Sequence, residues 1–229
     1  MVTELWRYPV KSMLGERVTT LDLVPQGVIG DRAFAVRGAD GKLGSGKSSR
    51  RFRRMPGLLT TAARLGAGGV TEVQLPDGTI ATAGHATTDA ALTTLLGEPV
   101  ELVEDRTGAH LDDAPVHLAT TASLRWLDEQ VPDTSVDARR LRPNVVVRCE
   151  EVGIVEAAWT GRRLRIGSAA LLVTVETVRC AMVAAEQQEL ARAPHLLRAL
   201  EQGNDLCLGV YATVEVPGRI ALGDAVRAD

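Results

Sequence analysis

Cys180 is the side chain of this sequence best suited to chemistry. It follows Arg179 at the end of the apolar run 169–178, where a predicted strand gives way to a loop. A neighbouring cation favours the ionised sulfur, and the thiolate is the form that binds metals and attacks electrophiles. A free cysteine is also often buried as a small hydrophobic residue. Cys180 alone therefore leaves two alternatives, a functional thiol and a packing residue.

Basic and polar side chains elsewhere in the chain are suited to binding an anion. Lys11 and Ser12 follow the first predicted strand, and Arg32 stands at the start of the third. Much further along, Arg142 and Asn144 precede another strand. Lysine and arginine beside hydroxyl and amide donors suit a group with several oxygens, which arginine can bind through two parallel hydrogen bonds. Pairing with a nearby aspartate is the plain structural alternative for each arginine.

Residues 41–48 match the phosphate-binding pattern G-x-x-x-x-G-K-[ST]. That loop works by joining a buried strand to the amino terminus of a long helix. Here the next residues, SRRFRRMP, carry no amphipathic pattern and end in a proline. We therefore expect a glycine-rich hairpin tip, with a P-loop nucleotide binder as the less favoured alternative. The basic residues in this stretch form a solvated loop or meet an anionic ligand or partner; they are Lys47, Arg50, Arg51, Arg53 and Arg54.

Length and composition limit the possible classes of protein. The chain of 229 residues suits one large or two small domains, and its net charge of −3 argues against a protein that coats nucleic acid. Three widely spaced cysteines without a Cys-x-x-Cys pair predict neither a disulfide framework nor a zinc knuckle. The first twelve residues lack a secretory signal pattern, and no apolar stretch is long enough to span a membrane. We expect a cytoplasmic protein with no membrane or specific nucleic-acid partner.

The first half of the chain reads as strands and tight turns. Hydrophobic residues make up 45% of the sequence but aromatic ones only 3%, so the core is built from small aliphatic residues that suit strands. Hairpins are predicted around Asp40-Gly41 and Asp77-Gly78. A helix over 89–96, with Gly97 as its C-cap, precedes a strand over 100–103. The polar segment 104–114 then indicates a domain boundary.

The second half adds a few short helices to further strands. Thr120 and Thr121 offer N-cap hydroxyls to a helix that Pro132 ends. Residues 186–200 look helical but contain Pro194, so we predict two short helices, the second ending near residue 203. Strands are predicted over 145–147, 163–166, 169–175 and 206–216. The expected fold class is mainly β (α+β), with a hairpin-rich first third.

Five segments occur in an order that resembles the MOSC family, which is named for the carboxy-terminal domain of molybdenum cofactor sulfurases. They are YPVKS (8–12), GDRAF (30–34), DAPVHLATTASL (113–124), RLRPNVVV (140–147) and VRC (178–180). The first part is similar to the β-barrel module that precedes MOSC domains in amidoxime-reducing mitochondrial proteins and their bacterial relatives. The resemblance covers nearly the whole chain. It implies a MOSC N-terminal β-barrel-like module over 1–108 and a MOSC-type β-barrel domain over 109–229.

The resemblance also implies a site for the molybdenum cofactor, Mo-molybdopterin. In it Cys180 is the catalytic residue and the sulfur ligand of the metal, which a soft thiolate suits. The residues implied to bind the cofactor are Lys11, Ser12, Arg32, Thr120, Ser123, Arg142, Asn144 and Arg179. For Thr120 and Ser123, capping of the predicted helix is the structural alternative.

The activity implied by the resemblance is the two-electron reduction of a small N-hydroxylated compound. The chain stops at Asp229 without the C-x4-C-x2-C pattern of an iron–sulfur domain, so a separate electron-transfer protein is expected to supply the electrons. A non-catalytic carrier of the cofactor or of its sulfur remains an alternative of a different class. The basic stretch 44–54 departs from the plainer hairpin expected of amidoxime reductases, and docking of an acidic redox partner is one role for it.

Four histidines lack the spacing of metal ligands and are assigned surface or packing roles: His85, His110, His117 and His195. Asp113 lies in one of the five segments and is a further candidate, as a proton donor.

Overall fold

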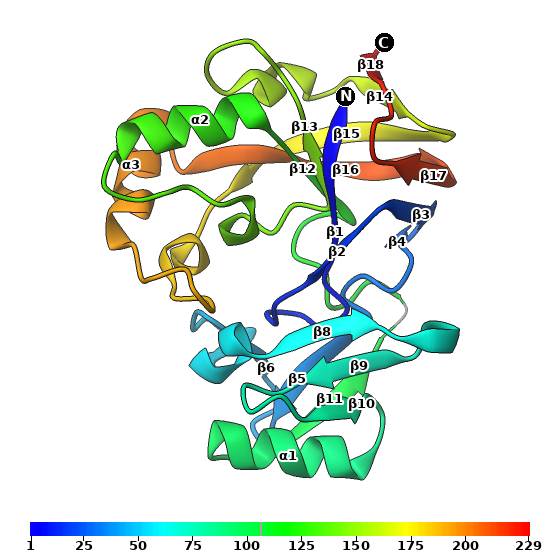
Figure 1. The fold of residues 1–229 in the computed structure, drawn as a ribbon, viewed down its shortest axis with the longest axis vertical. Helices are drawn as coiled ribbons and strands as arrows, with labels where there is room; N and C mark the ends of the chain where they lie inside the picture. Colours follow the sequence, from blue (N-terminus) through cyan, green and yellow to red (C-terminus); the bar gives the residue numbers. More distant parts are fainter. Residues whose placement is uncertain (106) are drawn as a thin grey trace.

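Strands dominate the computed structural model, which describes residues 1–105 and 107–229 (Figure 1). The strands of the first half are β1 (Val2–Arg7), β2 (Glu16–Val18), β3 (Thr20–Val24), β4 (Gly27–Val28), β5 (Phe34–Gly38), β6 (Leu43–Ser45), β7 (Phe52–Arg54), β8 (Ala62–Leu65), β9 (Thr71–Gln74), β10 (Ile80–Thr82) and β11 (Val100–Glu104). Those of the second half are β12 (Val116–Thr120), β13 (Val145–Val147), β14 (Arg163–Ile166), β15 (Ala169–Val178), β16 (Cys207–Val216), β17 (Gly218–Ala221) and β18 (Val226–Ala228).

Helices are fewer and short in the described residues. The α-helices are α1 (Ala86–Leu96), α2 (Thr121–Gln130) and α3 (Pro194–Asn204). The 3-10 helices are η1 (Pro56–Thr60), η2 (Ala67–Gly69), η3 (Ala138–Arg140), η4 (Val155–Trp159) and η5 (Ala181–Ala184). The fold is mainly β, as the composition predicted.

The larger part of the molecule is built on an eight-stranded sheet with the order β18-β14-β15-β16-β12-β13-β1-β2. Strand β1 lies antiparallel to β13, with Leu5 opposite Val145, and β12 lies parallel to β13. One face of this sheet carries a fully buried aliphatic core that includes Leu5, Leu118, Leu171 and Val210. Helices α2 and α3 lie to one side of the sheet (Figure 1) and share a second core with it.

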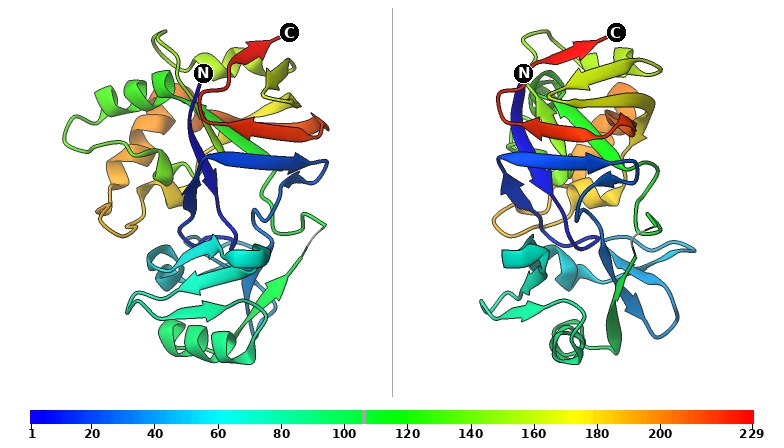
Figure 2. Two further views of the ribbon diagram at one scale, coloured as in Figure 1. Left: turned by 45° about the vertical axis from the view of Figure 1, so that its right-hand side comes forward. Right: turned by 90° about the vertical axis from the view of Figure 1, so that its right-hand side faces the viewer.

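Residues 34–104 form a smaller unit, which we call the N-terminal module. It combines a four-stranded sheet, β11-β5-β6-β7, with a three-stranded one, β10-β9-β8. Its core includes Val36, Leu58, Val73 and Leu92, the last of these from α1. Figures 1 and 2 show the module below the larger sheet, with both chain termini at the opposite end of the molecule.

The local patterns of the first half predicted its elements well. Gly41 and Gly78 lie in turns with φ of 77° and 88°, the left-handed region that glycine adopts freely, and so confirm both hairpins. Helix α1 ends at Gly97, which has φ of 72° as expected of a C-cap, and begins three residues before the predicted start. Between β6 and β7 the described chain forms no helix. Residues 41–48 therefore do not lead into the helix that a nucleotide-binding loop, the less favoured alternative, requires.

The prediction of two helices over 186–203 is wrong. Residues 186–193 form no helix, and Gln187 and Leu190 instead make an isolated antiparallel bridge. Only the second helix exists as α3, with Pro194 in its first turn, where its missing N–H costs nothing. Strand β15 also runs to Val178, three residues past its predicted end.

Strands near the start of the chain pair with strands from its second half. Besides the pairing of β1 with β13, strand β3 pairs with β17. The division of the chain at residue 108 stays a prediction. Within the described residues, no helix combines the length and the apolar character needed to cross a bilayer.

A buried carboxylate joins three elements of the larger part. Glu156 of η4 is fully buried. Its Oε2 accepts a hydrogen bond of 2.7 Å from Thr120 Oγ1 at the start of α2, and its Oε1 accepts one of 3.1 Å from the Gly209 N–H in β16. Burial raises the pKa of Glu156, although these hydrogen bonds oppose the shift. Folding therefore favours the protonated carboxyl.

Replacing Glu156 tests this joint. Glu156→Ala should lower the free energy of unfolding by about 3 kcal/mol, because two buried donors lose their acceptor. Glu156→Gln, which keeps the shape, should cost less. Because folding raises this pKa, the stability that the carboxyl contributes is lost as the pH rises through its folded value. Urea denaturation at several pH values should show that loss in the wild type and not in the Gln variant; identical pH profiles would contradict the assignment.

Candidate functional site

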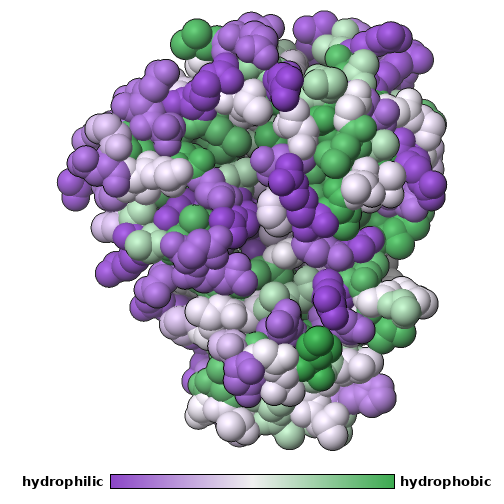
Figure 3. All heavy atoms as spheres, in the orientation of Figure 1, coloured by the Kyte–Doolittle hydropathy of each residue, from purple (hydrophilic) through white to green (hydrophobic). Residues whose placement is uncertain are grey.

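A pocket of about 210 Å³ lies where the larger part meets the N-terminal module. The module contributes Ser45, Lys47, Arg51 and Phe52, and the larger part contributes His117, Leu141, Arg142, Val178, Arg179, Cys180, Met182 and Tyr211. The connecting segments contribute Lys11, Ser12, Arg32, Asp112 and Asp113. Six basic and two acidic side chains make the pocket cationic. Figure 3 shows hydrophilic side chains gathered over this junction.

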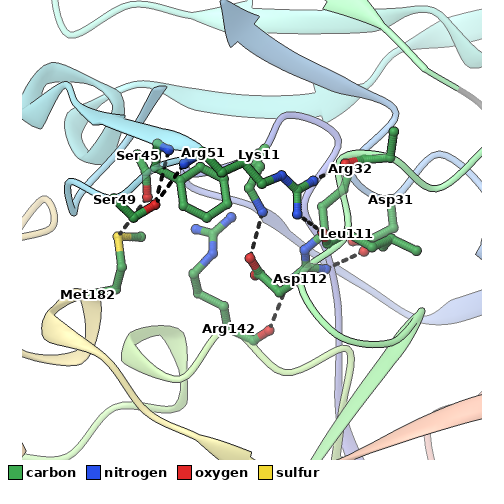
Figure 4. Close-up of polar contacts among 12 residues, drawn as sticks. Lys11, Asp31, Arg32, Ser45, Ser49, Arg51, Leu111, Asp112, Arg142 and Met182 are labelled. Carbon is green, nitrogen blue, oxygen red and sulfur yellow. Dashed lines mark hydrogen bonds and ion pairs between the residues drawn. The ribbon is translucent and has the colours of Figure 1, made fainter. Parts of the chain in front are cut away.

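The structure brings together six of the nine side chains singled out from the sequence. Lys11, Ser12, Arg32, Arg142, Arg179 and Cys180 all line the pocket, although they are up to 169 positions apart in the chain (Lys11 to Cys180). Figure 4 shows Arg142 and Met182 on the side of the larger part, facing Ser45 and Arg51 of the module.

The ring of Tyr8 supports two of the arginines. The Cζ atoms of Arg142 and Arg32 lie 4.2 Å and 5.1 Å from its centroid, within the range of cation–π attraction. Arg32 also forms an ion pair with Asp31, whose Oδ1 accepts a 2.7 Å hydrogen bond from the Tyr8 N–H. Arg142 donates from Nη1 to the Met13 carbonyl at 2.6 Å, but its buried Nη2 has no partner among the described residues.

Burial, together with repulsion from Arg32, lowers the pKa of Arg142 to about 10, so the side chain remains a cation at neutral pH. For Arg32, burial acts in the same direction, but Asp31 and Asp112 outweigh it and raise its pKa. The pocket therefore holds two permanent guanidinium charges side by side. One of them, Arg142, has a donor atom, Nη2, that is free to bind a ligand.

Three pocket residues have left-handed backbones that only glycine adopts without strain. The φ values are 65° for Ser12, 51° for Arg32 and 57° for Arg142. Each such residue costs about 1 kcal/mol or more and persists only where the surrounding structure holds it. Here the N–H of Arg32 donates to the Tyr8 carbonyl at 2.7 Å, and that of Arg142 donates to Ala138 at 3.1 Å. Strain of this kind clusters at functional sites.

Lys11 is a buried cation with one carboxylate partner. Its side chain is 5% exposed, and its Nζ lies 2.8 Å from Asp112 Oδ1. Burial lowers the pKa of Lys11 to about 8, even though Asp112 opposes the shift. Burial would raise the pKa of Asp112, but Lys11 and Arg32 outweigh it and bring that pKa to about 2. At neutral pH both groups are ionised.

Cys180 is half-buried and directly precedes η5. The neighbouring Arg179 donates from Nη2 to the Leu141 carbonyl at 2.6 Å, and its Nη1 lies 3.4 Å from His117 Nε2. These contacts hold the guanidinium against the Leu141 carbonyl and against His117. Burial, reinforced by Arg179, lowers the pKa of His117 well below its usual range, so the imidazole is neutral.

Three of the residues implied to bind the cofactor are not brought to the pocket. Thr120 and Ser123 are fully buried and cap each other's backbone N–H at the start of α2, the structural alternative given for them above. Asn144 is also fully buried; its Oδ1 accepts from the His117 N–H at 3.1 Å and its Nδ2 donates to the Trp6 carbonyl at 3.3 Å. Their polar groups are thus occupied by the fold.

The aromatic residues of the site were not predicted from the sequence. Tyr8 supports two arginines, Phe52 and Tyr211 line the pocket, and Tyr211 packs against His117 with ring centroids 5.3 Å apart. His117, assigned a surface or packing role, is buried and also faces the pocket. One feature of the sequence could have drawn attention to these residues: the chain has only two tyrosines and two phenylalanines.

Comparison with known families agrees with this geometry. Residues 1–114 match the family model of the MOSC N-terminal beta barrel domain, and residues 102–227 match that of the MOSC domain. The chain belongs to the MOSC family. The five ordered segments had indicated this membership, and the two models together account for residues 1–227. MOSC proteins are associated with molybdenum cofactor binding.

A solved structure resembles this MOSC protein in fold, and others show a weaker similarity. The YuaD protein of Bacillus subtilis is 16% identical, with a TM-score of 0.55, and the match covers 100% of this chain and 96% of that one. YiiM of Escherichia coli is 12% identical with a TM-score of 0.45, over 97% and 69% of the two chains. YiiM of Geobacillus stearothermophilus is 16% identical with a TM-score of 0.41, over 67% and 68%. No curated protein sequence matches the chain.

Two substitutions of Tyr8 separate the role of its ring from that of its hydroxyl. The buried Oη has no partner among the described residues, so Tyr8→Phe should change the free energy of unfolding by less than about 0.5 kcal/mol. Tyr8→Leu should lower it by about 3 kcal/mol, because a cavity forms and two cations lose their aromatic face. Chemical denaturation measures both values. An equally large loss in the Phe variant would show that the hydroxyl carries the effect.

The pKa of Lys11 predicts how anion binding depends on pH. Lys11 loses its proton as the pH rises through about 8, so the affinity for sulfate, whose own charge is constant, should fall on the order of tenfold. Lys11→Arg keeps its charge and should bind sulfate evenly across this range. Calorimetric titration from about pH 7 to pH 9 tests this. A flat wild-type profile would contradict the role given to Lys11.

Proposed function

We propose that this MOSC protein is a molybdenum-cofactor-dependent reductase of small N-hydroxylated compounds. The observation that supports it is the convergence of one thiol, Cys180, with Lys11, Arg32, Arg142 and Arg179 on a single pocket. A soft metal bound to an anionic organic group needs a sulfur ligand and several cations close together. No other part of the described chain offers both.

The donor set fits the molybdenum cofactor. Arg142 Nη2 and Arg179 Nε are buried and lack partners within the described chain, and a buried donor is costly unless a ligand accepts its hydrogen bond. A phosphate and a pterin supply such acceptors. In this proposal Lys11, Ser12, Arg32, Arg142 and Arg179 hold the organic anion, and Cys180 binds the metal.

The bound cofactor would supply the two-electron chemistry that no amino-acid side chain provides. The chain's own residues bind, orient and protonate. Burial raises the pKa of Tyr211, so its phenol keeps a proton inside the pocket at neutral pH. The neutral His117 accepts from Arg179 through Nε2 and so holds that guanidinium in place. Asp113 also lines the pocket and remains a candidate proton donor.

Apolar side chains limit the entry of water. Leu141 and Met182 line the pocket on the side of Cys180, and Phe52 lines it on the side of the module. Exclusion of water strengthens every electrostatic contact made inside. The substrate nitrogen would be placed between these walls.

The electron donor in this proposal is a separate redox protein. The chain has three cysteines, all free, whereas an iron–sulfur cluster takes four ligands. The half-buried Cys149 and Cys207 are not part of the pocket lining. Cys149 serves as the matched control for Cys180, because Cys207 pairs across the strands with Val178 of that lining.

Substitution of Cys180 tests the proposal. Protein from a host that makes the cofactor should contain about one molybdenum per chain and reduce N-hydroxybenzamidine with an artificial electron donor. Cys180→Ser should lower turnover at least about a thousandfold, because a hydroxyl is a poor ligand for a soft metal. Cys149→Ser should keep both metal and turnover. Metal without turnover in the wild type would indicate a cofactor carrier, and absence of metal would refute the proposal.

A further inference from the structure

The module wall of the pocket carries two cations that the proposed cofactor site does not use. We propose that Lys47 and Arg51 bind an oxyanion of the substrate, so that this protein prefers N-hydroxylated compounds bearing a carboxylate or a phosphate. This inference rests on the proposed function and names the substrate class of the same pocket.

The charges of the pocket are unevenly balanced. Lys11 is paired with Asp112 and Arg32 with Asp31. Within the described chain neither Lys47 nor Arg51 forms an ion pair. Arg51 donates to the carbonyls of Ala109 and Leu111, which fix its position but leave its charge uncompensated. Asp113 is the one further acidic residue in the lining.

Phe52 holds these cations at the pocket. Phe52 is 7% exposed, and the centroid of its ring lies 5.4 Å from Lys47 Nζ, 5.1 Å from Arg51 Cζ and 5.0 Å from Lys11 Nζ. Three cations near one aromatic ring are attracted to its negative face while they repel one another. An oxyanion placed among them relieves that repulsion. The ring itself offers an apolar surface for the body of an organic substrate.

This wall lies close to the loop of the thiol. A Cβ added to Gly46 would come within 2.3 Å of Met182 Sδ, so the β6–β7 connection packs closely against the Met182 side chain of η5. Ser45 Oγ lies 3.9 Å from the same sulfur. Lys47 follows directly, and Met182 is two residues beyond Cys180. Lys47, Arg51 and Cys180 line the same pocket, so in this proposal a ligand whose nitrogen approaches Cys180 meets Lys47 and Arg51 with its other end.

The pocket already stabilises one carboxylate. The Asp112 side chain is 43% exposed, yet its pKa falls to about 2, because Lys11, Arg32 and Lys47 favour the ionised form over the opposing effect of burial. A substrate carboxylate that binds beside Lys47 and Arg51 would likewise be surrounded by cations that favour its ionised form. Both residues lie in the basic stretch whose role the sequence left open.

Three matched substrates test the inference: N-hydroxybenzamidine and its para-carboxylate and para-trimethylammonium derivatives. The molybdenum-loaded protein should show a kcat/KM for the carboxylate on the order of tenfold above that for the neutral compound, and lowest for the cation. Lys47→Gln should reduce this ratio severalfold, and Lys47→Arg should restore it. Arg50→Gln, an exposed neighbour outside the lining, should leave the ratio unchanged.

Binding separates the two proposals. para-Carboxybenzamidine is the amidine that corresponds to the para-carboxylate substrate. It has no N-hydroxyl group to reduce, so calorimetry measures its affinity without turnover. It should bind more tightly than benzamidine, and high salt or Lys47→Gln should abolish the difference. Reduction of all three substrates, without preference for the carboxylate in rate or binding, overturns the inference and leaves the proposed function standing. If none is reduced, the proposed function fails, and the binding preference alone decides whether the anion subsite exists.

Discussion

Two guanidinium groups stacked on one tyrosine ring are the contact on which the site depends. Arg32 and Arg142 repel each other, and both are removed from water, so each needs compensation. Asp31 compensates Arg32 and also fixes the Tyr8 backbone, so one carboxylate orders the ring and its first cation together. Arg142 is compensated only in part. The fold thus holds a buried cation whose charge and hydrogen-bond donors are only partly compensated. Binding of an anion would stabilise this arrangement, and without the anion the arrangement costs free energy.

The strained backbones of Ser12, Arg32 and Arg142 follow from the same requirement. All three residues line the pocket from loops. A residue in the left-handed conformation changes the direction of the backbone sharply within such a loop. The sheet supplies the rigidity. Strand β1 ends just before Tyr8, and β13 begins shortly after Arg142, so the pairing of these strands places both loops at one end of the sheet.

What the sequence could predict was local or linear. Turns at Asp40-Gly41 and Asp77-Gly78, the Gly97 cap and the Thr120 cap each depend on a few adjacent residues, and all were found. The ordered segments gave the family and six of the pocket residues. The cation–π contacts of Tyr8 and Phe52 join residues far apart in the chain, so no spacing revealed them. Residues 186–193 failed as a helix because the helical pattern there competes with the Gln187–Leu190 bridge.

The antiparallel pairing of β1 with β13, and of β3 with β17, also constrains the order of assembly on the ribosome. A nascent chain of about 105 residues contains every strand of the N-terminal module, but of the partners of β1 and β3 it contains only β2 and β4 and lacks β13 and β17. One edge of β1 and one edge of β3 therefore stay unpaired until residues 145–147 and 218–221 have emerged. Such long-range closure is slow. The first residues translated are therefore among the last to reach their native neighbours.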